Sequence, residues 1–263
     1  MSQDELTRAR FAATADRLAV LGGERTPALR ERLRRFVAPA GSERALDVGT
    51  GTGPLALALA PLVAEVVGLD LVPEMLEHAR RAAQGVSNVK FVAGQAERMP
   101  FPSESFDLVA TARTIHHVAW PEVVIAEMTR VARTGGRLLV VDQIASVDPL
   151  EALAHNRIER LRDPSHVRVL SDQDFRLLFD VNGLVLRHSE VEREDRDLDE
   201  FLDLAGCTES QREAVRAEIG RLLASDQRAG IALRTSGEGY ALTLSIAWYL
   251  LEKPARPAST TAT

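Results

Sequence analysis

Residues 45–53 spell Ala-Leu-Asp-Val-Gly-Thr-Gly-Thr-Gly, and residues 66–70 spell Val-Val-Gly-Leu-Asp. The first stretch predicts an apolar strand that runs into three glycines at alternate positions and then into a helix. The second predicts another apolar strand that ends in a carboxylate, Asp70. Glycines at such a turn let the backbone approach a ligand where a Cβ atom would collide, and the amides of the helix N-terminus face the same crevice. Since an Asp about 20 residues after such a turn can hold both hydroxyls of a ribose, we predict a nucleoside-binding βαβ unit.

The glycine spacing separates two classes of nucleoside cofactor. The dinucleotide fingerprint is G-x-G-x-x-G, in which the helix N-terminus holds a pyrophosphate. Here the spacing is G-x-G-x-G, followed by Pro54, which suits the first turn of a helix. Asp47 lies inside the motif, where its charge would repel a pyrophosphate and attract a cation. S-Adenosylmethionine has a ribose, an adenine, an ammonium and a sulfonium but no phosphate, so the residues favour it over NAD. An NAD-dependent oxidoreductase remains an alternative.

Length and composition narrow the class of protein. The 263 residues are 45% hydrophobic and 27% charged, which is typical of a soluble globular chain with one large α/β domain. A net charge of −6 and the lack of a basic face with interleaved aromatics argue against nucleic acid as a partner. Cys207 is the single cysteine, so disulfides and cysteine zinc sites are excluded. The first ten residues contain no signal-peptide core, and no apolar run is long enough for a membrane span.

From these features we expect a cytoplasmic protein that acts on a small molecule, with no nucleic-acid or membrane partner and with a homodimer left open. Arginine outnumbers lysine and alanine is abundant, which hints at a bacterial source with a GC-rich genome.

Strands and helices alternate after the motif begins. Strands are expected at 44–49, 65–70, 88–93, 105–112 and 136–142, and helices at 53–63, 73–84 and 121–133. Nearly continuous apolar strands, such as residues 138–141, indicate burial on both faces and hence a parallel sheet. This alternation predicts a doubly wound, Rossmann-like α/β fold with its ligand at the carboxyl ends of the strands.

The flanking regions follow other patterns. Further helices are expected at 3–21, 26–36, 171–182 and 198–226, and further strands at 185–191 and 240–252. Residues 146–170 are polar and rich in turn formers. Residues 190–200 are heavily charged, which predicts a solvated connection. The Pro/Ala/Thr-rich tail at 254–263 is expected to be disordered.

Five motifs in order resemble the class I S-adenosylmethionine-dependent methyltransferases, and within them the ubiquinone/menaquinone-biosynthesis-like group that acts on small molecules. The motifs are LDVGTGTG (46–53), GLD (68–70) with PEML (73–76), GQAERMPF (94–101), FDLV (106–109) leading to HH (116–117), and RVARTGG (130–136). The match covers roughly residues 40–190, with a closing strand at 240–253. The resemblance implies a seven-stranded sheet whose last strand is antiparallel.

The resemblance also implies a division of the chain. Residues 1–36 would form an N-terminal helical cover, and residues 37–253 the methyltransferase domain. Cover insertions would lie at about 146–170 and 198–230, and residues 254–263 would form the tail.

Carried over residue by residue, the resemblance implies a cofactor site. Its members would be Asp47, Gly49, Thr50, Gly51, Asp70, Leu71, Gln95, Ala96, Thr111 and Ala112. Asp47 would orient the methionine part of the cofactor, which passes close to the glycines, and Asp70 would hold the ribose.

The adenine would lie against Leu71, with its edge at Gln95 and at the backbone N–H of Ala96, while Thr111 and Ala112 would line the methyl donor. Position 95 departs from the usual pattern, which has Asp there. A glutamine carbonyl can still accept from the exocyclic amine of adenine.

The candidate catalytic residues are those that could act as a base. Methyl transfer is an in-line displacement on an activated sulfonium, so alignment is the enzyme's main contribution, and a base is needed only if the acceptor loses a proton. The candidates are His116 or His117, Asp142 and His166, since histidine titrates near working pH. We favour His117. Neighbouring histidines on a helix or strand point in different directions, so at most one is expected to face the site. Arg113 would hold an anionic substrate group or form a surface ion pair, and no metal site is expected.

Residues 156–168 resemble a run found in a bacterial subset of these enzymes, where it forms part of the substrate cover; an ordinary capped helix and turn is the alternative. Apolar residues of the cover, Phe11, Phe201 and Leu204, hint at a hydrophobic substrate. The resemblance thus implies S-adenosylmethionine-dependent methyl transfer to carbon, oxygen or nitrogen of a small organic molecule in bacterial biosynthesis. The alternative is a non-methylating relative that keeps S-adenosylmethionine or S-adenosylhomocysteine as a structural or electrostatic element, or a catalytically silent binding partner.

Overall fold

One twisted sheet organises the protein, whose structure is a computed structural model that describes residues 1–237 and 239–255. The strand order is β3-β2-β1-β4-β5-β8-β6, and β7 pairs with β8. The bounds are β1 Arg44–Val48, β2 Glu65–Asp70, β3 Val89–Ala93, β4 Phe106–Ala112, β5 Ala132–Ile144, β6 Val185–Asp197, β7 Arg234–Ser236 and β8 Gly239–Glu252. Strands β1 to β5 pair in parallel, and β8 runs antiparallel to β5 and β6. The predicted doubly wound sheet with an antiparallel last strand is confirmed, and the short β7 is an additional strand.

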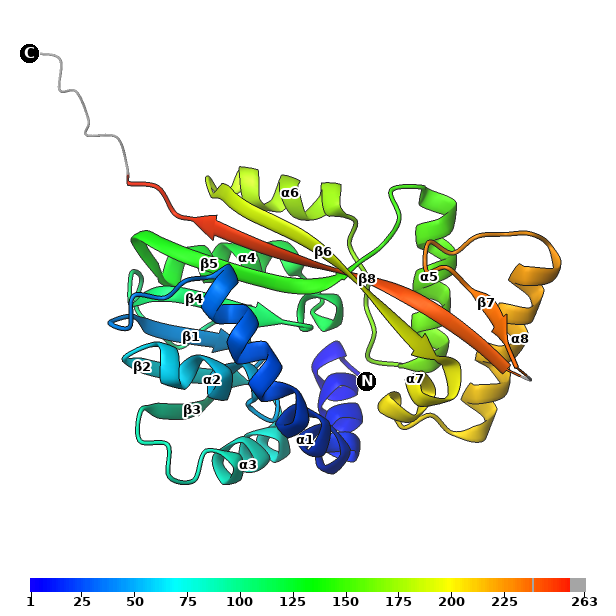
Figure 1. The fold of residues 1–263 in the computed structure, drawn as a ribbon, viewed down its shortest axis with the longest axis horizontal. Helices are drawn as coiled ribbons and strands as arrows, with labels where there is room; N and C mark the ends of the chain where they lie inside the picture. The colour runs from blue at the N-terminus through cyan, green and yellow to red at the C-terminus, as the bar shows by residue number, and fades with distance from the viewer. Residues whose placement is uncertain (238, 256–263) are drawn as a thin grey trace, which may run out of the picture.

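Helices cover both faces of this sheet and gather at one end (Figure 1). The bounds are α1 Gln3–Phe36, α2 Pro54–Leu59, α3 Pro73–Ala82, α4 Pro121–Val131, α5 Pro149–Arg162, α6 Asp172–Val181, α7 Leu198–Ala205 and α8 Glu209–Ala224, with single 3₁₀ turns η1 Ala60–Leu62 and η2 Ile115–His117. In Figure 1, β6 and β8 extend well past the other strands, and α5, α7 and α8 surround their far ends. No helix in the described ranges is long and apolar enough to cross a bilayer.

Two hydrophobic cores lie on opposite faces of the sheet. Along β5, Leu138 and Val140 join one core, and Leu139 and Val141 join the other. All four are buried, because successive side chains of a strand point to opposite faces. This explains why the sequence of a doubly covered strand is apolar without alternation.

The two helices expected before the core are one helix, α1, which continues through Gly22, Gly23 and Pro27. A proline inside a helix removes one backbone hydrogen bond. Here α1 packs on α2, α3 and α7 along its length, and tertiary packing supplies most helical stability in proteins. The predicted break was therefore wrong.

After β5, one segment noted only for its turn formers contains a helix, and one expectation was wrong. The turn-rich segment 146–170 contains α5, which Asp148 caps by accepting from the amides of Leu150 and Glu151. The charged segment 190–200 is not a solvated connection, because β6 pairs with β8 as far as Asp197 and α7 begins at Leu198. Most of the tail expected to be disordered, residues 256–263, lies outside the described residues.

Candidate functional site

A cavity of about 740 Å³ opens at the carboxyl ends of β1, β2 and β4, within the size range typical of small-molecule sites. Residues from the loops after these strands form one side of it. The rest is formed by α1 from Gln3 to Arg32, by the far ends of β6 and β8, and by α7. The cavity therefore lies between the sheet and the segments predicted to be a cover.

The loop after β1 is shaped for close approach to a ligand. Gly49 and Gly51 have positive φ angles of 70° and 54°, which L residues with a Cβ rarely adopt. The amides of Gly49 and Thr50 both donate to the carbonyl of Leu69, at 2.8 and 2.9 Å. A Cβ atom on Gly49 would lie 2.3 Å from the Thr114 hydroxyl oxygen, so position 49 requires glycine on both steric and conformational grounds.

Two carboxylates border this loop, Asp47 fully buried and Asp70 half-buried. Asp70, at the end of β2, accepts from the amides of Gly51 (2.7 Å) and Val72 (2.9 Å). Asp47 accepts from the Thr50 hydroxyl at 2.6 Å. Burial raises the pKa of Asp47 to about 7 and also raises the pKa of Asp70. A cation bound beside them would relieve this cost, because an opposite charge favours the ionised form of a carboxyl group.

The loop after β3 meets the first turn of α1. Leu71, Gln95 and Ala96 line the cavity, as does Asp4. The side-chain amide nitrogen of Gln95 donates to a carboxylate oxygen of Asp4 at 2.5 Å, which leaves the carbonyl oxygen of Gln95 as an acceptor. The pKa of the nearby Glu97 is raised by burial and, to a smaller extent, by the charge of Asp4.

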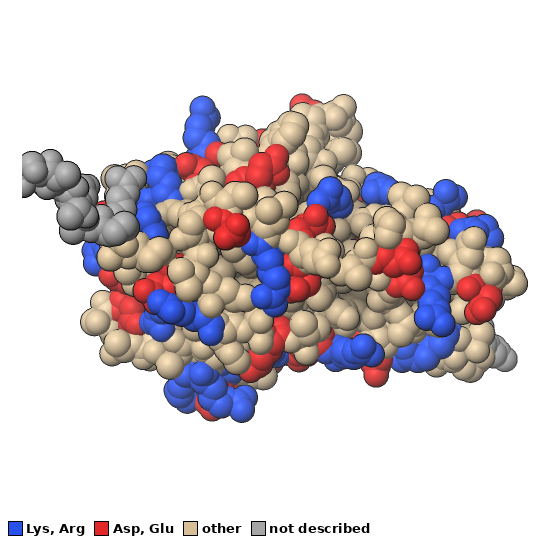
Figure 2. Space-filling view, turned by 90° about the horizontal axis from the view of Figure 1, so that it is seen from above, with Lys and Arg blue, Asp and Glu red and all other residues tan. Residues whose placement is uncertain are grey.

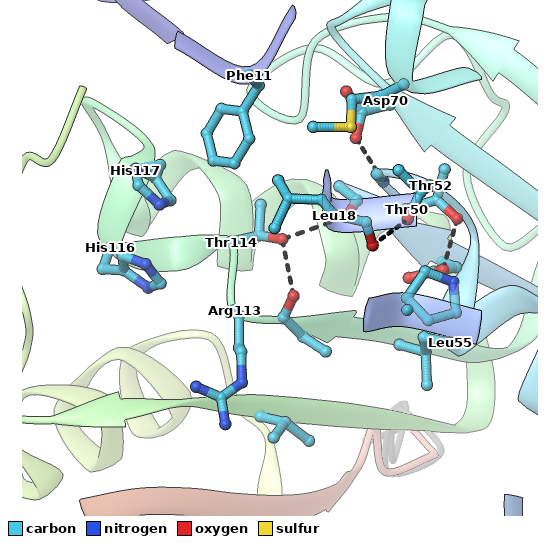
Figure 3. A pocket seen from close by; sticks show the side chains of 18 of the residues that line it. Phe11, Leu18, Thr50, Thr52, Leu55, Asp70, Arg113, Thr114, His116 and His117 are labelled. Carbon is cyan, nitrogen blue, oxygen red and sulfur yellow. Dashed lines mark hydrogen bonds between the residues drawn. The ribbon is translucent and has the colours of Figure 1, made fainter. Parts of the chain in front are cut away.

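Both His116 and His117 line the cavity, so the expectation that at most one would face the site was wrong. The reason is local geometry: they belong to the single 3₁₀ turn η2, reached through Arg113 at a φ of 56°. Their ring centroids are 4.2 Å apart. Figure 3 shows both rings on one side of the cavity and Asp70, Thr50 and Thr52 on the other.

Each histidine is held through its Nδ1 atom. Nδ1 of His116 lies 2.5 Å from a carboxylate oxygen of Asp142, whose other oxygen accepts from the amide of Ile115 at 2.8 Å. Nδ1 of His117 lies 3.3 Å from the hydroxyl of Ser165, which itself donates to Asp163 at 2.7 Å. Within the described part of the chain, neither Nε2 has a hydrogen-bond partner, so each neutral ring can accept a proton there.

The charge state of His117 favours this role. Its pKa lies well below the ordinary value, first because the ring is buried and then because His116, Arg10 and His166 are close. His117 is therefore neutral at physiological pH. Phe11 of α1 packs edge-on against it, at 4.9 Å between centroids.

Three of the residues named from the sequence do not line the cavity: Thr111, Asp142 and His166. Thr111 is fully buried in β4, and its hydroxyl donates to the carbonyl of Val48 at 2.8 Å. Asp142 lies behind His116. His166 is 3.0 Å from the side-chain oxygen of Asn156, and burial lowers its pKa to about 3. Ala112 lines the cavity, as do the other named cofactor residues.

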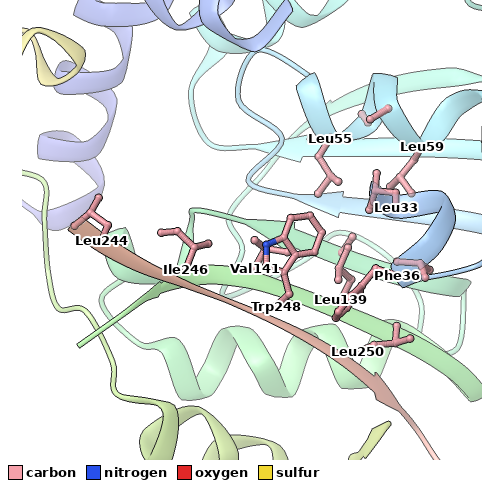
Figure 4. Packing of buried hydrophobic residues seen from close by; sticks show 14 of the residues in the cluster. Leu33, Phe36, Leu55, Leu59, Leu139, Val141, Leu244, Ile246, Trp248 and Leu250 are labelled. Carbon is pink, nitrogen blue, oxygen red and sulfur yellow. The ribbon is translucent and has the colours of Figure 1, made fainter. Parts of the chain in front are cut away.

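The cover contributes residues that sequence reasoning did not single out. Leu244, Ile246 and Trp248 follow each other at alternate positions on β8 and share one face (Figure 4). Phe11, Phe201 and Leu204, which were singled out, line the cavity too. From β6 come Glu192, Glu194 and Arg196. Their spacing of two residues is the signal of a strand with one face turned inward, and it was hidden because every residue between them is charged or polar as well.

Among the described residues there is no group of three or more His, Cys, Asp or Glu side chains placed to hold a metal ion.

Residues 46–140 match a family described as a methyltransferase domain. The chain is 43% identical over 143 residues to the uncharacterized methyltransferase YcgJ of Bacillus subtilis (54% of this chain, 56% of that protein). It is 35% identical over 137 residues to a demethylmenaquinone methyltransferase of Clavibacter sepedonicus (52% and 56%). The chain thus spans about half the length of these relatives. The crystal structure of YcgJ superimposes with a TM-score of 0.82 and 29% identity, over 87% of this chain and 99% of that one.

Proposed function

We propose that the chain is a class I S-adenosylmethionine-dependent methyltransferase, like the proteins to which it is similar. It transfers a methyl group from this cofactor to a small, largely hydrophobic organic acceptor. The observation that carries the proposal is the Asp70 carboxylate at the end of β2. It lies beside a glycine loop that a Cβ atom would block. A Rossmann-like fold uses this arrangement to hold a ribose.

The residues of the cavity fit this cofactor. Asp70 keeps acceptor capacity for the ribose hydroxyls, since a carboxylate has about four lone-pair sites and two are used by Gly51 and Val72. Asp47 would hold the positively charged methionine part. Leu71 would contact the adenine, with Gln95 and Ala96 at its edge. When bound, the cofactor supplies an activated methyl group on a sulfonium; the task of the protein is to align the acceptor and exclude water.

A base is available if the acceptor must lose a proton. Asp142 holds the ring of His116 with its Nδ1 atom occupied, and Ser165 does the same for His117. Both leave Nε2 as the proton-accepting atom beside the cavity. We propose His117 as the base. His116, whose ring Asp142 holds, lies beside it. His166 does not reach the cavity. It would affect the reaction only by packing against His116 and His117.

The cover supports a hydrophobic acceptor. Phe11, Phe201, Leu204, Ile246 and Trp248 line the cavity away from the cofactor loop, and apolar lining with few polar groups is typical of small-molecule sites. One of the relatives is named a demethylmenaquinone methyltransferase. An acceptor related to a quinone is therefore one class to include in a screen.

Calorimetric titration with S-adenosylmethionine and S-adenosylhomocysteine tests the first half of the proposal. We expect both to bind in the micromolar range. A screen of aromatic and alkyl acceptors, followed through S-adenosylhomocysteine release, tests the second half. His117→Ala should leave cofactor affinity unchanged and slow turnover, whereas equal loss of both would make the residue structural. Cofactor binding without turnover on any acceptor would favour a non-methylating relative.

A further inference from the structure

We propose that the acceptor carries an anionic group, such as a carboxylate, sulfate or phosphate, which is bound by Arg113, Arg196 and Arg25. This inference rests on the proposed function, because it assigns the substrate class of the same cavity. The residues come from three separate elements: the loop after β4, the far end of β6, and α1. All three line the cavity.

Two of the three arginines pair with the carboxylate of Glu194, and the third feels its charge. Arg113 forms an ion pair with one oxygen of Glu194, and Arg196 forms an ion pair with the other. Arg25 lies close enough for Glu194 to raise its pKa, although burial and the two other arginines lower it by more. The charge of Glu24 also raises the pKa of Arg25. Three guanidinium groups against the carboxylates of Glu194 and Glu24 leave one positive charge in excess. Since guanidinium groups bind carboxylate and phosphate through paired hydrogen bonds, an anion would complete the cluster.

This local excess is opposite in sign to the whole chain, whose net charge is −6. Apart from Glu192 and Glu194, the acidic residues of the cavity lie elsewhere. They surround the cofactor loop and the Gln95 loop and are Asp47, Asp70, Asp4 and Glu97. Arg32, which also lines the cavity, is balanced by Glu190 and Glu192. The cavity thus has an acidic part suited to a cationic cofactor and a basic part suited to an anion. By contrast, acidic and basic side chains are interspersed on the outer face in Figure 2.

The backbone at Arg113 supports a built site. Its φ of 56° is unusual for a residue with a side chain, and such strained conformations cluster at ligand sites. The Arg113 amide donates to the carbonyl of Val141 at 2.8 Å, which holds the turn between β4 and β5. Figure 3 shows that the Arg113 side chain extends away from both Thr114 and Asp70. An anion there would lie beyond the cofactor loop, on the acceptor side.

The neighbouring wall is apolar. Leu244, Ile246 and Trp248 lie on β8, which pairs with β6 so that Glu194 is opposite Leu244 and Arg196 opposite Leu242. An acceptor with an apolar body and one anionic end matches this combination. Neutral acceptors of the same shape would leave the positive excess uncompensated.

Calorimetric titration of matched ligand pairs tests the proposal: 2-naphthoate and octanoate, each against its methyl ester, in the presence and absence of S-adenosylhomocysteine. We expect at least one acid to bind about tenfold or more tightly than its ester, a preference typical of charge-assisted pairing. Raising the salt concentration should reduce that preference. If neither acid is preferred, including the case in which nothing binds, the proposal is overturned.

Two variants with opposite expected effects separate an anion site from a structural ion-pair cluster. Arg196→Gln should weaken acid binding about tenfold and leave ester binding unchanged. Glu194→Gln removes the competing carboxylate and should tighten acid binding; weaker acid binding in this variant would contradict the proposal. Arg212→Gln, which breaks a surface ion pair with Asp203 outside the cavity, is the control. If the protein binds the acids but not S-adenosylhomocysteine, the proposed function is contradicted and the anion site is supported.

Discussion

The cofactor loop and the cover form opposite sides of one cavity, but they are held by different kinds of contact. In the loop, the decisive hydrogen bonds join residues close in sequence: Thr50 to Asp47, three apart, and Gly51 to Asp70, 19 apart. In the cover, Gln3 donates to the carbonyls of His117 and Ser165, which are 114 and 162 residues away. One side of the site is a local motif; the other exists only when distant segments meet.

The cover is also joined to the histidines by charge. Arg10 of α1 forms an ion pair with Asp163 at 2.7 Å, and the two side chains are 12% and 0% exposed. Asp163 in turn accepts from the amide and hydroxyl of Ser165, the residue beside His117. α1 therefore stabilises the base region and closes the cavity at the same time. Among the substitutions considered below, loss of this ion pair is expected to have the largest effect on stability.

Replacing Arg10 by Leu should lower the free energy of unfolding by roughly 3–5 kcal/mol, because the buried carboxylate of Asp163 loses its ion-pair partner and keeps only the hydrogen bonds from Ser165. Urea denaturation measures the loss. Arg212→Leu, at an exposed pair with Asp203, should cost at most about 1 kcal/mol. If both substitutions lower the free energy of unfolding by a similar, small amount, the Arg10–Asp163 ion pair does not hold α1 in place.

Asp70→Ala should weaken S-adenosylhomocysteine binding more than tenfold, since two charge-assisted hydrogen bonds of roughly 1.5–3 kcal/mol each would be lost. Calorimetric titration gives the change. Asp203→Ala, outside the cavity, serves as the control. Unchanged affinity in Asp70→Ala would remove the ribose assignment and make the local motif a structural feature only.

S-Adenosylmethionine should bind less tightly as the pH falls from about 8 to about 6. Protonation of Asp47, whose pKa is about 7, removes a negative charge beside the cationic ligand, and the affinity change for one such group is at most roughly tenfold. Asp70, the neighbouring carboxylate, contributes to raising that pKa. Titration at several pH values measures the effect. Asp47→Asn should abolish it, and adenosine, which lacks the methionine part, should show none in the native protein.

Gly23→Ala should raise the free energy of unfolding by about 0.5–1 kcal/mol, because Gly23 lies inside a continuous helix where alanine is favoured. No atom lies within 4 Å of the added Cβ, whereas a Cβ on Gly22 would be 3.1 Å from the Thr52 hydroxyl oxygen. Gly22→Ala should therefore gain less. If Gly23→Ala is destabilising in thermal unfolding, the chain breaks at this position as the sequence had suggested.

The parallel sheet and the placement along the cavity of all the named cofactor residues except Thr111 could be predicted, because each depends on short-range patterns. Leu138 to Val141 are apolar in a row because both faces of β5 are covered, and positive φ angles at Gly49 and Gly51 follow from the turn after β1. The β6 extension could not be predicted. Its charged residues 190–197 look like a solvated connection until pairing with β8 turns alternate side chains toward the cavity.

The sequence by itself determined the crevice: glycines where a Cβ would collide, and a carboxylate at the end of the next strand, both set by contacts within one βαβ unit. Only the tertiary structure decided that His116 and His117 share the cavity and that Asp4 meets Gln95. It also decided that Arg113 and Arg196 pair with Glu194 in the cavity that Arg25 lines. The physical reason is the separation along the chain over which each interaction acts. Backbone conformation and strand burial act between near neighbours, whereas ion pairs and buried side-chain contacts join whichever segments the packed fold brings together.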